Sequence, residues 1–245
     1  MVADLKLKLV HLYPLFLNIY GDIGNVKVLK NRCEWRGIDL EIEQLNIGDK
    51  LEPGTDIFFI GGGQDRQQIE VSEEIQNHKT LLTEEYNNNA VFLGICGGYQ
   101  LMGEYYQPHD AKRLEGICIL DAYTVAGSTR FIGNVTATTD YIPEKDTLVG
   151  FENHSGLTYL RGDTTPMAQI VVGNGNNGQD RTEGARSKNA FGTYLHGSFL
   201  PKNPHFADYL IKLALQKRYN DDIQLEPLDD TIEYKAHEAV LNKAY

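Results

Sequence analysis

The chain has 245 residues, of which 41% are hydrophobic and 23% charged, and these proportions are ordinary for a globular protein. Its formal net charge of −11, from 34 acidic and 23 basic residues, argues against nucleic acids and anionic membranes as partners, because both are bound through Lys and Arg. No apolar run approaches the ~18 residues of a membrane-spanning helix, the N-terminus lacks a secretory pattern, and the three scattered cysteines resemble neither a disulfide framework nor a metal-ligand set.

The first half of the chain alternates short apolar runs with helical patterns. We expect strands over residues 6–13, 17–20, 40–45, 56–60 and 90–95, and helices over residues 26–36, 70–87 and 99–106. This alternation is typical of buried parallel strands that are joined by crossover helices. No internal repeat or linker-like tract divides the chain, so we expect a single domain over residues 1–245.

The second half has a different composition. From about residue 116 to residue 193 it is rich in Thr, Gly, Asn and Val, with turn signals such as GNGNNG at residues 173–178. This pattern predicts β-hairpins beside or extending the main sheet. Residues 204–218 return to a helical pattern, and residues 227–245 predict a further helix. The fold class that follows is α/β, with a mostly parallel central sheet, flanking helices and extra hairpins.

Cys96 lies in the segment GICGG, directly after an apolar strand and at the start of a predicted helix. A nucleophile elbow has this setting, because a strained turn exposes the reactive side chain and neighbouring glycines relieve the crowding. The helix start would stabilise a thiolate, and the N–H of Gly97 could help to bind an oxyanion. An isolated cysteine is more often a small buried hydrophobic residue, but glycines on both sides after a strand favour a nucleophile.

A cysteine nucleophile needs a base, and His196 in GTYLHG is the preferred candidate among seven histidines. It ends a predicted strand about a hundred residues after Cys96, and it would accept the thiol proton and later protonate the leaving group. His154 is the rival, because its segment GFENHSG is also dense in glycine and polar groups.

Three glycines at residues 61–63 follow the apolar run at residues 56–60. Glycines after a strand let backbone N–H groups approach a ligand closely. The loop lacks the GK[ST] ending of a P-loop, which argues against nucleotide binding. Gly62 is a candidate partner of Gly97 in an oxyanion hole, and a tight turn without any ligand is the alternative.

Taken together, these segments resemble a known family. GICGGYQLMG is similar to the nucleophile elbow of class I glutamine amidotransferases, GTYLHG is similar to their histidine motif, and the Cys-Gly-Gly-Tyr-Gln variant resembles the CobB/CobQ-type branch. Within this branch, LNIYGDIGN, FFIGGGQDRQQ, GFENHSG, GNGNN and GTYLHG resemble the glutaminase subunits (GatD) of lipid II isoglutaminyl synthases. These motifs run from Leu17 to Phe199, so the resemblance covers nearly the whole chain.

The resemblance implies a flavodoxin-like fold and a glutaminase that hydrolyses L-glutamine through a cysteine thioester. It further implies that the ammonia passes to a separate subunit, MurT in this family, which resembles a Mur ligase and amidates the D-glutamate of lipid II to D-isoglutamine in peptidoglycan synthesis. The expected assembly is a heterodimer without a cofactor in this chain, with ATP and Mg on the partner. A reducing cytoplasm is the expected location.

Individual residues can be carried over from the family to this sequence. Cys96 matches the nucleophile and His196 the general base. Arg130 in STRFIGN matches an arginine that binds the substrate glutamine, and a guanidinium can hold a carboxylate in a bidentate manner. Gln100 and the backbone of Gly63 are further candidate contacts to the substrate.

The sequence departs from the family pattern at Ser198. Most class I enzymes complete a catalytic triad with a Glu two residues after the histidine, and a serine cannot supply the negative charge that stabilises an imidazolium. Either another acid of this chain, such as Glu152, takes this role, or the partner subunit supplies the acid, which is the option that we favour. Whether Asp65, Asn153 and His154 contact the substrate stays open at this point.

Other functions stay open at this point. The chain could serve a different acceptor, such as a cobyrinate-type corrin or a pyridoxal-phosphate synthase, or it could hydrolyse γ-glutamyl peptides. It could also be a non-catalytic or redox-sensing binding module of the same fold. Labelling of Cys96 alone by an electrophilic glutamine analogue would favour catalysis, because Cys33 on a predicted helix and Cys118 in an apolar run are expected to be structural.

Overall fold

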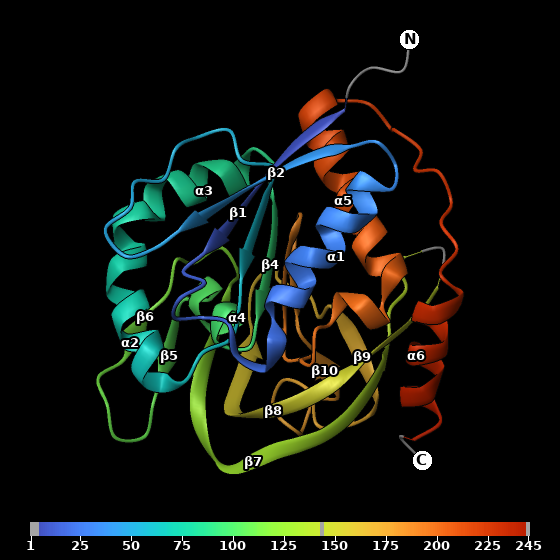
Figure 1. Ribbon diagram of the computed structural model, residues 1–245. Coiled ribbons are helices and arrows are strands. Elements are labelled where there is room, and N and C mark those ends of the chain that lie inside the picture. Colours follow the sequence, from blue (N-terminus) through green and yellow to red (C-terminus); the bar gives the residue numbers. More distant parts are fainter. Residues whose placement is uncertain (1–4, 143–144, 244–245) are drawn as a thin grey trace.

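The computed structural model describes residues 5–142 and 145–243, and strands and helices alternate through its first half (Figure 1). The elements of this half are β1 (Lys6–Leu12), η1 (Ile19–Gly21), α1 (Ile23–Glu34), β2 (Asp39–Leu45), β3 (Ile57–Ile60), α2 (Asp65–Glu74), η2 (Ile75–His78), α3 (Lys79–Asn87), β4 (Val91–Ile95) and α4 (Gly97–Met102). Every residue of β3 and β4 is buried, because helices cover both faces of their sheet and leave no face for polar residues.

The second half is dominated by strands until its last two helices. Its elements are β5 (Tyr105–Gln107), β6 (Leu114–Glu115), β7 (Ala122–Thr138), β8 (Thr147–Leu160), β9 (Ala168–Val172), β10 (Thr182–Glu183), β11 (Ala185–Ser187), β12 (Ala190–Thr193), η3 (Leu200–Lys202), α5 (Pro204–Tyr219) and α6 (Thr231–Leu241). The predicted change from alternating strands and helices to a β-rich second half is therefore confirmed. The GNGNNG segment forms the turn between β9 and β10.

The central sheet has the strand order β11-β12-β4-β3-β1-β2, and all its neighbours are parallel except β11 and β12. Helices α2 and α3 lie on one side of it and α1 and α5 on the other (Figure 1). This confirms the predicted α/β class with a mostly parallel sheet between helices. Because β4 and β12 are parallel and in register up to Ile95 and Thr193, the residues that follow them meet at one edge of the sheet.

The second sheet has the strand order β10-β9-β7-β5-β6, with β8 paired to β7, and it supplies the predicted hairpins. Strands β7 and β8 form a long antiparallel ribbon that curves under the central sheet (Figure 1). A short bridge between Phe151 in β8 and His196 joins this ribbon to the segment after β12. The ribbon is thereby held beside the carboxyl edge of the central sheet.

The core of the central sheet is built from the apolar runs that the sequence shows. Phe58 of β3 stacks on Phe92 of β4 with ring centroids 4.6 Å apart, and both side chains are fully buried. Burial of one such side chain contributes roughly 1.5–3 kcal/mol. Cys33 on α1 belongs to the same core, in agreement with the structural role expected for it.

One predicted strand is wrong, and one predicted helix is too long. Residues 17–20, predicted as a strand, form a turn and the 3-10 helix η1, because the chain turns back after β1 and Ile19 N–H donates to the Gly62 carbonyl oxygen. The helix predicted over residues 99–106 ends at Met102, where Gly103 is extended and Tyr105 enters β5.

Other boundaries shift by a few residues. Helix α1 begins at Ile23, before the predicted start, and the helix predicted over residues 70–87 begins at Asp65 and is interrupted by η2. The C-terminal helix begins at Thr231 rather than at residue 227, and residues 244 and 245 of that prediction lie outside the described residues. A single domain over residues 1–245 stays a prediction.

Candidate active site

Cys96 occupies a strained turn between β4 and α4. Its φ of 50° and ψ of −103° lie in a region that non-glycine residues seldom adopt, so neighbouring contacts must hold it there. Its N–H donates to the Thr193 carbonyl oxygen at 2.8 Å, and its own carbonyl oxygen accepts from Gln100 N–H at 3.0 Å. The side chain is 7% exposed and lines a cavity of about 380 Å³. This is the elbow geometry that the sequence predicts.

Glycines on both sides of Cys96 allow the close approach of strand and helix. A Cβ on Gly98 would collide with the Ile60 carbonyl oxygen of the neighbouring strand, and one on Gly94 would stand 2.6 Å from the Met102 sulfur. Gly98 N–H also donates to the Gly61 carbonyl oxygen at 3.1 Å. The elbow and the glycine loop after β3 are therefore packed directly against each other.

His196 lies three residues after β12, at the same sheet edge as Cys96. It is fully buried, and its backbone bonds to Phe151 in both directions. Burial, reinforced by the nearby His154 and Arg130, lowers its pKa from 6.5 to about 3. Its imidazole is therefore neutral at physiological pH.

No carboxylate is bonded to the imidazole of His196 within the described residues, where both ring nitrogens lack a hydrogen-bond partner. Ser198, at the position of the usual acid, turns away and donates to the Gly21 carbonyl oxygen at 2.7 Å. Glu152 accepts hydrogen bonds from Asn174 and Gly175, so its carboxylate serves the β9–β10 turn. The suggestion that Glu152 replaces the missing acid is therefore not supported by its contacts.

The glycine loop at residues 61–63 brings a correction. Gly62 N–H donates to the Asp22 carboxylate at 2.6 Å, so it is not available to bind an oxyanion. The sequence had suggested that role for Gly62. Gly63, in contrast, lines the cavity, and its nitrogen is 3.1 Å from the point where a Cβ on Gly97 would stand. The loop therefore reaches Gly97 through Gly63 rather than through Gly62.

Asp22 is a buried acid that the sequence reading missed. Its Oδ2 and the Cε1 atom of His196 lie 3.3 and 3.2 Å from the point where a Cβ on Gly62 would stand. Burial raises its pKa from 3.8 to about 7, while the hydrogen bond from Gly62 opposes the rise. The segment GDIGN carries the only sequence signal, a polar residue between glycines at the start of a helix.

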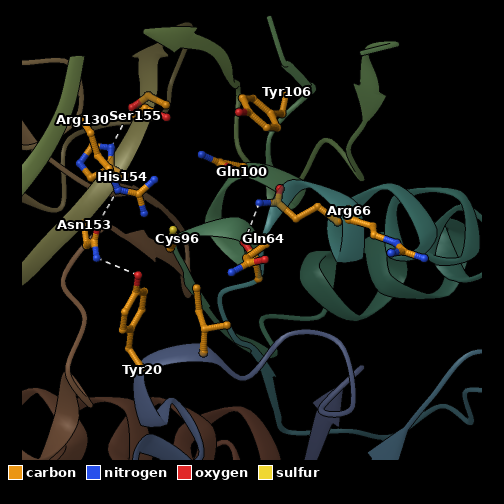
Figure 2. A pocket seen from close by; sticks show the side chains of 14 residues that line it. Tyr20, Gln64, Arg66, Cys96, Gln100, Tyr106, Arg130, Asn153, His154 and Ser155 are labelled. Carbon is orange, nitrogen blue, oxygen red and sulfur yellow. Dashed lines mark hydrogen bonds between the residues drawn. The ribbon is translucent and has the colours of Figure 1, made fainter. Parts of the chain in front are cut away.

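Arg130 lies on the opposite wall of the cavity from the glycine loop (Figure 2). It comes from β7 within a register shift between Ala126 and Phe131, so its backbone is not paired with a residue of β8. Its Nε donates to Asn153 Oδ1 at 2.7 Å, and Asn153 Nδ2 donates to Tyr20 Oη at 2.7 Å (Figure 2). The structure thus brings together Cys96 and Arg130 around one cavity, as expected.

Gln100 and His154 complete the polar wall of the cavity. Gln100 Nε2 donates to Tyr194 Oη at 3.1 Å, and the Tyr194 ring stacks on His154 with centroids 3.6 Å apart. Burial lowers the pKa of His154 to about 4, so its ring is neutral. His154, the rival base, therefore lines the cavity itself. His196 is fully buried, and its ring contacts the Tyr20 ring with centroids 5.1 Å apart.

The remaining cysteines lie away from the cavity. Burial raises the pKa of Cys33 to about 12, which keeps it a thiol. Cys118 is exposed and lies 3.3 Å from Lys79 Nζ, so its apolar sequence context did not predict its surface position. The side chain of Asp65 lies outside the described residues.

Across residues 5–142 and 145–243, no cluster of His, Cys, Asp and Glu could hold a metal ion. No helix in the same ranges is long and apolar enough to cross a membrane.

Comparison with known proteins places this geometry in context. Residues 8–204 match the CobB/CobQ-like glutamine amidotransferase domain. The chain is 38% identical to subunit GatD of the glutamine-hydrolysing lipid II isoglutaminyl synthase of Streptococcus pneumoniae, over 93% of this chain and 87% of that one. It is also 38% identical to the same subunit of Staphylococcus aureus, over 98% and 96% of the two chains.

A solved structure supports the fold independently. A glutamine amidotransferase from Thermotoga maritima superposes with a TM-score of 0.57 over 96% of this chain and 94% of that one. At 16% sequence identity this likeness concerns the fold alone, and it confirms the predicted flavodoxin-like architecture.

Proposed function

The chain belongs to the CobB/CobQ-like glutamine amidotransferases, and from this membership we propose that it is the glutaminase subunit of a lipid II isoglutaminyl synthase. One observation carries the catalytic part of the proposal: Cys96 stands at a left-handed elbow on the wall of a cavity that Arg130 also lines. The acceptor rests on the two GatD relatives, whose names state both glutamine hydrolysis and lipid II amidation.

In this proposal L-glutamine spans the cavity between Arg130 and Cys96. Its α-carboxylate binds the guanidinium of Arg130, which can donate two parallel hydrogen bonds. Its side-chain carboxamide lies over the sulfur of Cys96, and Gln100, which lines the same cavity, is a further contact. Arg130 is exposed at the cavity wall, so the free amino acid can reach it from solvent.

The chemistry needs one nucleophile and one proton carrier. His196 takes the thiol proton of Cys96, and the thiolate attacks the amide carbon. The oxyanion is held by the N–H of Gly97 and, in place of Gly62, by that of Gly63. His196 returns the proton to the departing nitrogen, so that ammonia leaves and a γ-glutamyl thioester remains. Water, deprotonated by His196, then cleaves the thioester and releases glutamate and the free thiol.

We assign the missing acid of the triad to the partner subunit. The support is that both nitrogens of His196 lack a partner among the described residues, while Ser198 and Glu152 are bonded elsewhere. The partner is a Mur-ligase-like subunit that binds ATP and Mg and receives the ammonia, and we place the heterodimer in the cytoplasm. Glutaminase activity should rise by at least about a hundredfold when the partner is added, because loss of the acid from a catalytic triad lowers kcat by as much as about 10⁴-fold. Full activity of the isolated chain would refute this assignment.

The nucleophile is tested by replacing it. In the complex with the co-purified synthase subunit, Cys96→Ala should abolish glutamine-dependent amidation of lipid II, while added ammonium salts should still support it. Cys118→Ala, which removes an exposed thiol away from the cavity, is the matched control and should behave as the wild type. Glutamine-dependent product from the Cys96→Ala complex would contradict the mechanism. Co-purification of a partner that is not Mur-ligase-like would contradict the proposed pathway instead.

A further inference from the structure

Tyr20 holds a place in the site that neither the sequence nor the proposed chemistry explains. It lies in η1 with φ of 53° and ψ of 24°, a left-handed conformation that is unfavourable for an aromatic residue. Tyr20 is 48% exposed and lines the cavity, and its ring contacts the His196 ring with centroids 5.1 Å apart and an interplanar angle of 71°. A strained and half-exposed aromatic ring beside the base indicates that contacts around it hold it there.

The hydroxyl group of Tyr20 connects it to the opposite wall. Tyr20 Oη accepts from Asn153 Nδ2 at 2.7 Å, and Asn153 Oδ1 accepts from Arg130 Nε at 2.7 Å (Figure 2). One amide group thus uses its acceptor for the arginine and its donor for the tyrosine. Asn153 is held in turn by the β7–β8 ribbon, where it pairs with Ile132.

This arrangement determines which N–H groups of the Arg130 guanidinium can bind a ligand. Because Nε is engaged by Asn153, the two terminal Nη nitrogens remain, and in the described ranges they make no hydrogen bond. A guanidinium binds a carboxylate through a pair of such parallel N–H groups. Asn153 therefore sets the plane of the carboxylate clamp, and Tyr20 sets the position of Asn153.

We propose that Tyr20 and Asn153 are positioning residues that fix the distance between the carboxylate clamp at Arg130 and the base His196, and so select glutamine against its shorter homologue asparagine. This inference rests on the proposed function, because it assumes that the ligand spans from Arg130 to Cys96 and that His196, at the same sheet edge as Cys96, serves that end of the ligand. A fixed span admits one chain length, and asparagine, which lacks one methylene, cannot reach both ends. Discrimination by one methylene is typically about 10–200-fold.

The test measures ligand binding without turnover. In the Cys96→Ala background, the dissociation constants of L-glutamine and L-asparagine are measured by calorimetry for the chain in complex with its co-purified subunit. Tyr20→Phe keeps the ring against His196 and removes only the hydroxyl group. We expect it to weaken glutamine binding and to lower the glutamine-to-asparagine selectivity by about tenfold, the effect of one lost hydrogen bond.

Two further variants make the result specific. Asn153→Ala should lower the selectivity to the same extent, and the double variant should add little to either change, because both residues act through one path. Tyr123→Phe is the matched control: its ring stacks on Tyr105 and Tyr159 on the ribbon, outside the cavity, and it should keep the selectivity.

The outcomes separate this inference from the proposed function. Unchanged selectivity in both Tyr20→Phe and Asn153→Ala would overturn it, as would a lack of any preference for glutamine in the Cys96→Ala parent. If Tyr20→Phe proves unfolded by circular dichroism, Asn153→Ala alone decides. Failure of the proposed function shows elsewhere, as a wild-type complex that binds glutamine selectively but does not hydrolyse it.

Discussion

Asp22 is a single buried residue that supports the candidate site without lining its cavity. Its carboxylate accepts the N–H of Gly62 and holds the glycine loop against the segment after β1. In the folded chain it is fully buried, and its Oδ1 has no hydrogen-bond partner among the described residues. An ionised carboxylate in this position is costly, because burial without full pairing disfavours the charged form.

The stability effect of Asp22 has a definite sign. Its pKa is raised from 3.8 to about 7, so folding binds a proton between these pH values, and its contribution to stability falls as the pH rises through that window. Asp22→Asn keeps an oxygen for Gly62 and cannot ionise. We expect its free energy of unfolding to exceed that of the wild type by on the order of 1–3 kcal/mol at pH 8, and by much less at pH 4. Urea denaturation at both pH values measures this, and a difference independent of pH would contradict it.

At the scale of secondary-structure elements, the elbow depends on how closely α4 approaches β3. The helix starts at Gly97 and packs its second residue, Gly98, on the Ile60 carbonyl oxygen. The parallel register of β4 and β12 then places the residues after Ile95 and Thr193 side by side. Small changes in this packing therefore shift the backbone at Cys96, the proposed nucleophile.

Gly98→Ala tests the packing of the elbow. The added methyl group meets backbone atoms of Ile60 that cannot move independently, so we expect a loss of about 1–3 kcal/mol in stability and a large loss of glutaminase activity. Gly133→Ala on β7 is the control, because a Cβ there meets nothing within 4 Å. Thermal denaturation and glutamine turnover are the two measurements. Wild-type values for Gly98→Ala would show that the elbow tolerates a wider helix–strand spacing.

For the whole molecule, the notable property is the burial of neutral histidines. Burial lowers the pKa of His11, His154 and His205 to about 4 and that of His196 to about 3. The unfolded chain binds protons at these positions near pH 6.5, whereas the folded chain does not. Stability contributed in this way is present above pH 6.5 and is lost as the pH falls toward 4.

Two buried carboxyl groups oppose this trend. Asp22 and Glu183 have pKa values raised to about 7 by burial, so their contributions increase as the pH falls. Because the histidines outnumber them, we expect the net stability of the wild type to fall between pH 6.5 and pH 4.5. Denaturation midpoints across this range measure the effect, and a flat or rising profile toward acid pH would contradict it.

His11→Leu should flatten the profile, since it removes one buried imidazole that packs on Phe59.

Local sequence patterns by themselves determined the strands at residues 56–60 and 90–95 and the turn around Cys96, whereas His196 as the base stays a prediction. Runs such as residues 56–60 and 90–95 are apolar at every position, and burial on both faces of a sheet is the one environment that suits them. Glycines around Cys96 likewise report a local backbone requirement. The residues that form such a signal lie within a few positions of one another, and for this reason the signal can be recognised in the sequence alone.

Only the tertiary structure decided which groups face each other across the cavity. The hydrogen bond between Gly62 and Asp22 joins residues 40 positions apart, and the one between Asn153 and Tyr20 joins residues 133 positions apart. The predicted strand at residues 17–20 failed for the same reason, since the Gly62 carbonyl oxygen holds that segment in a turn. Contacts between residues so far apart in the sequence depend on strand order and register, which local composition does not encode.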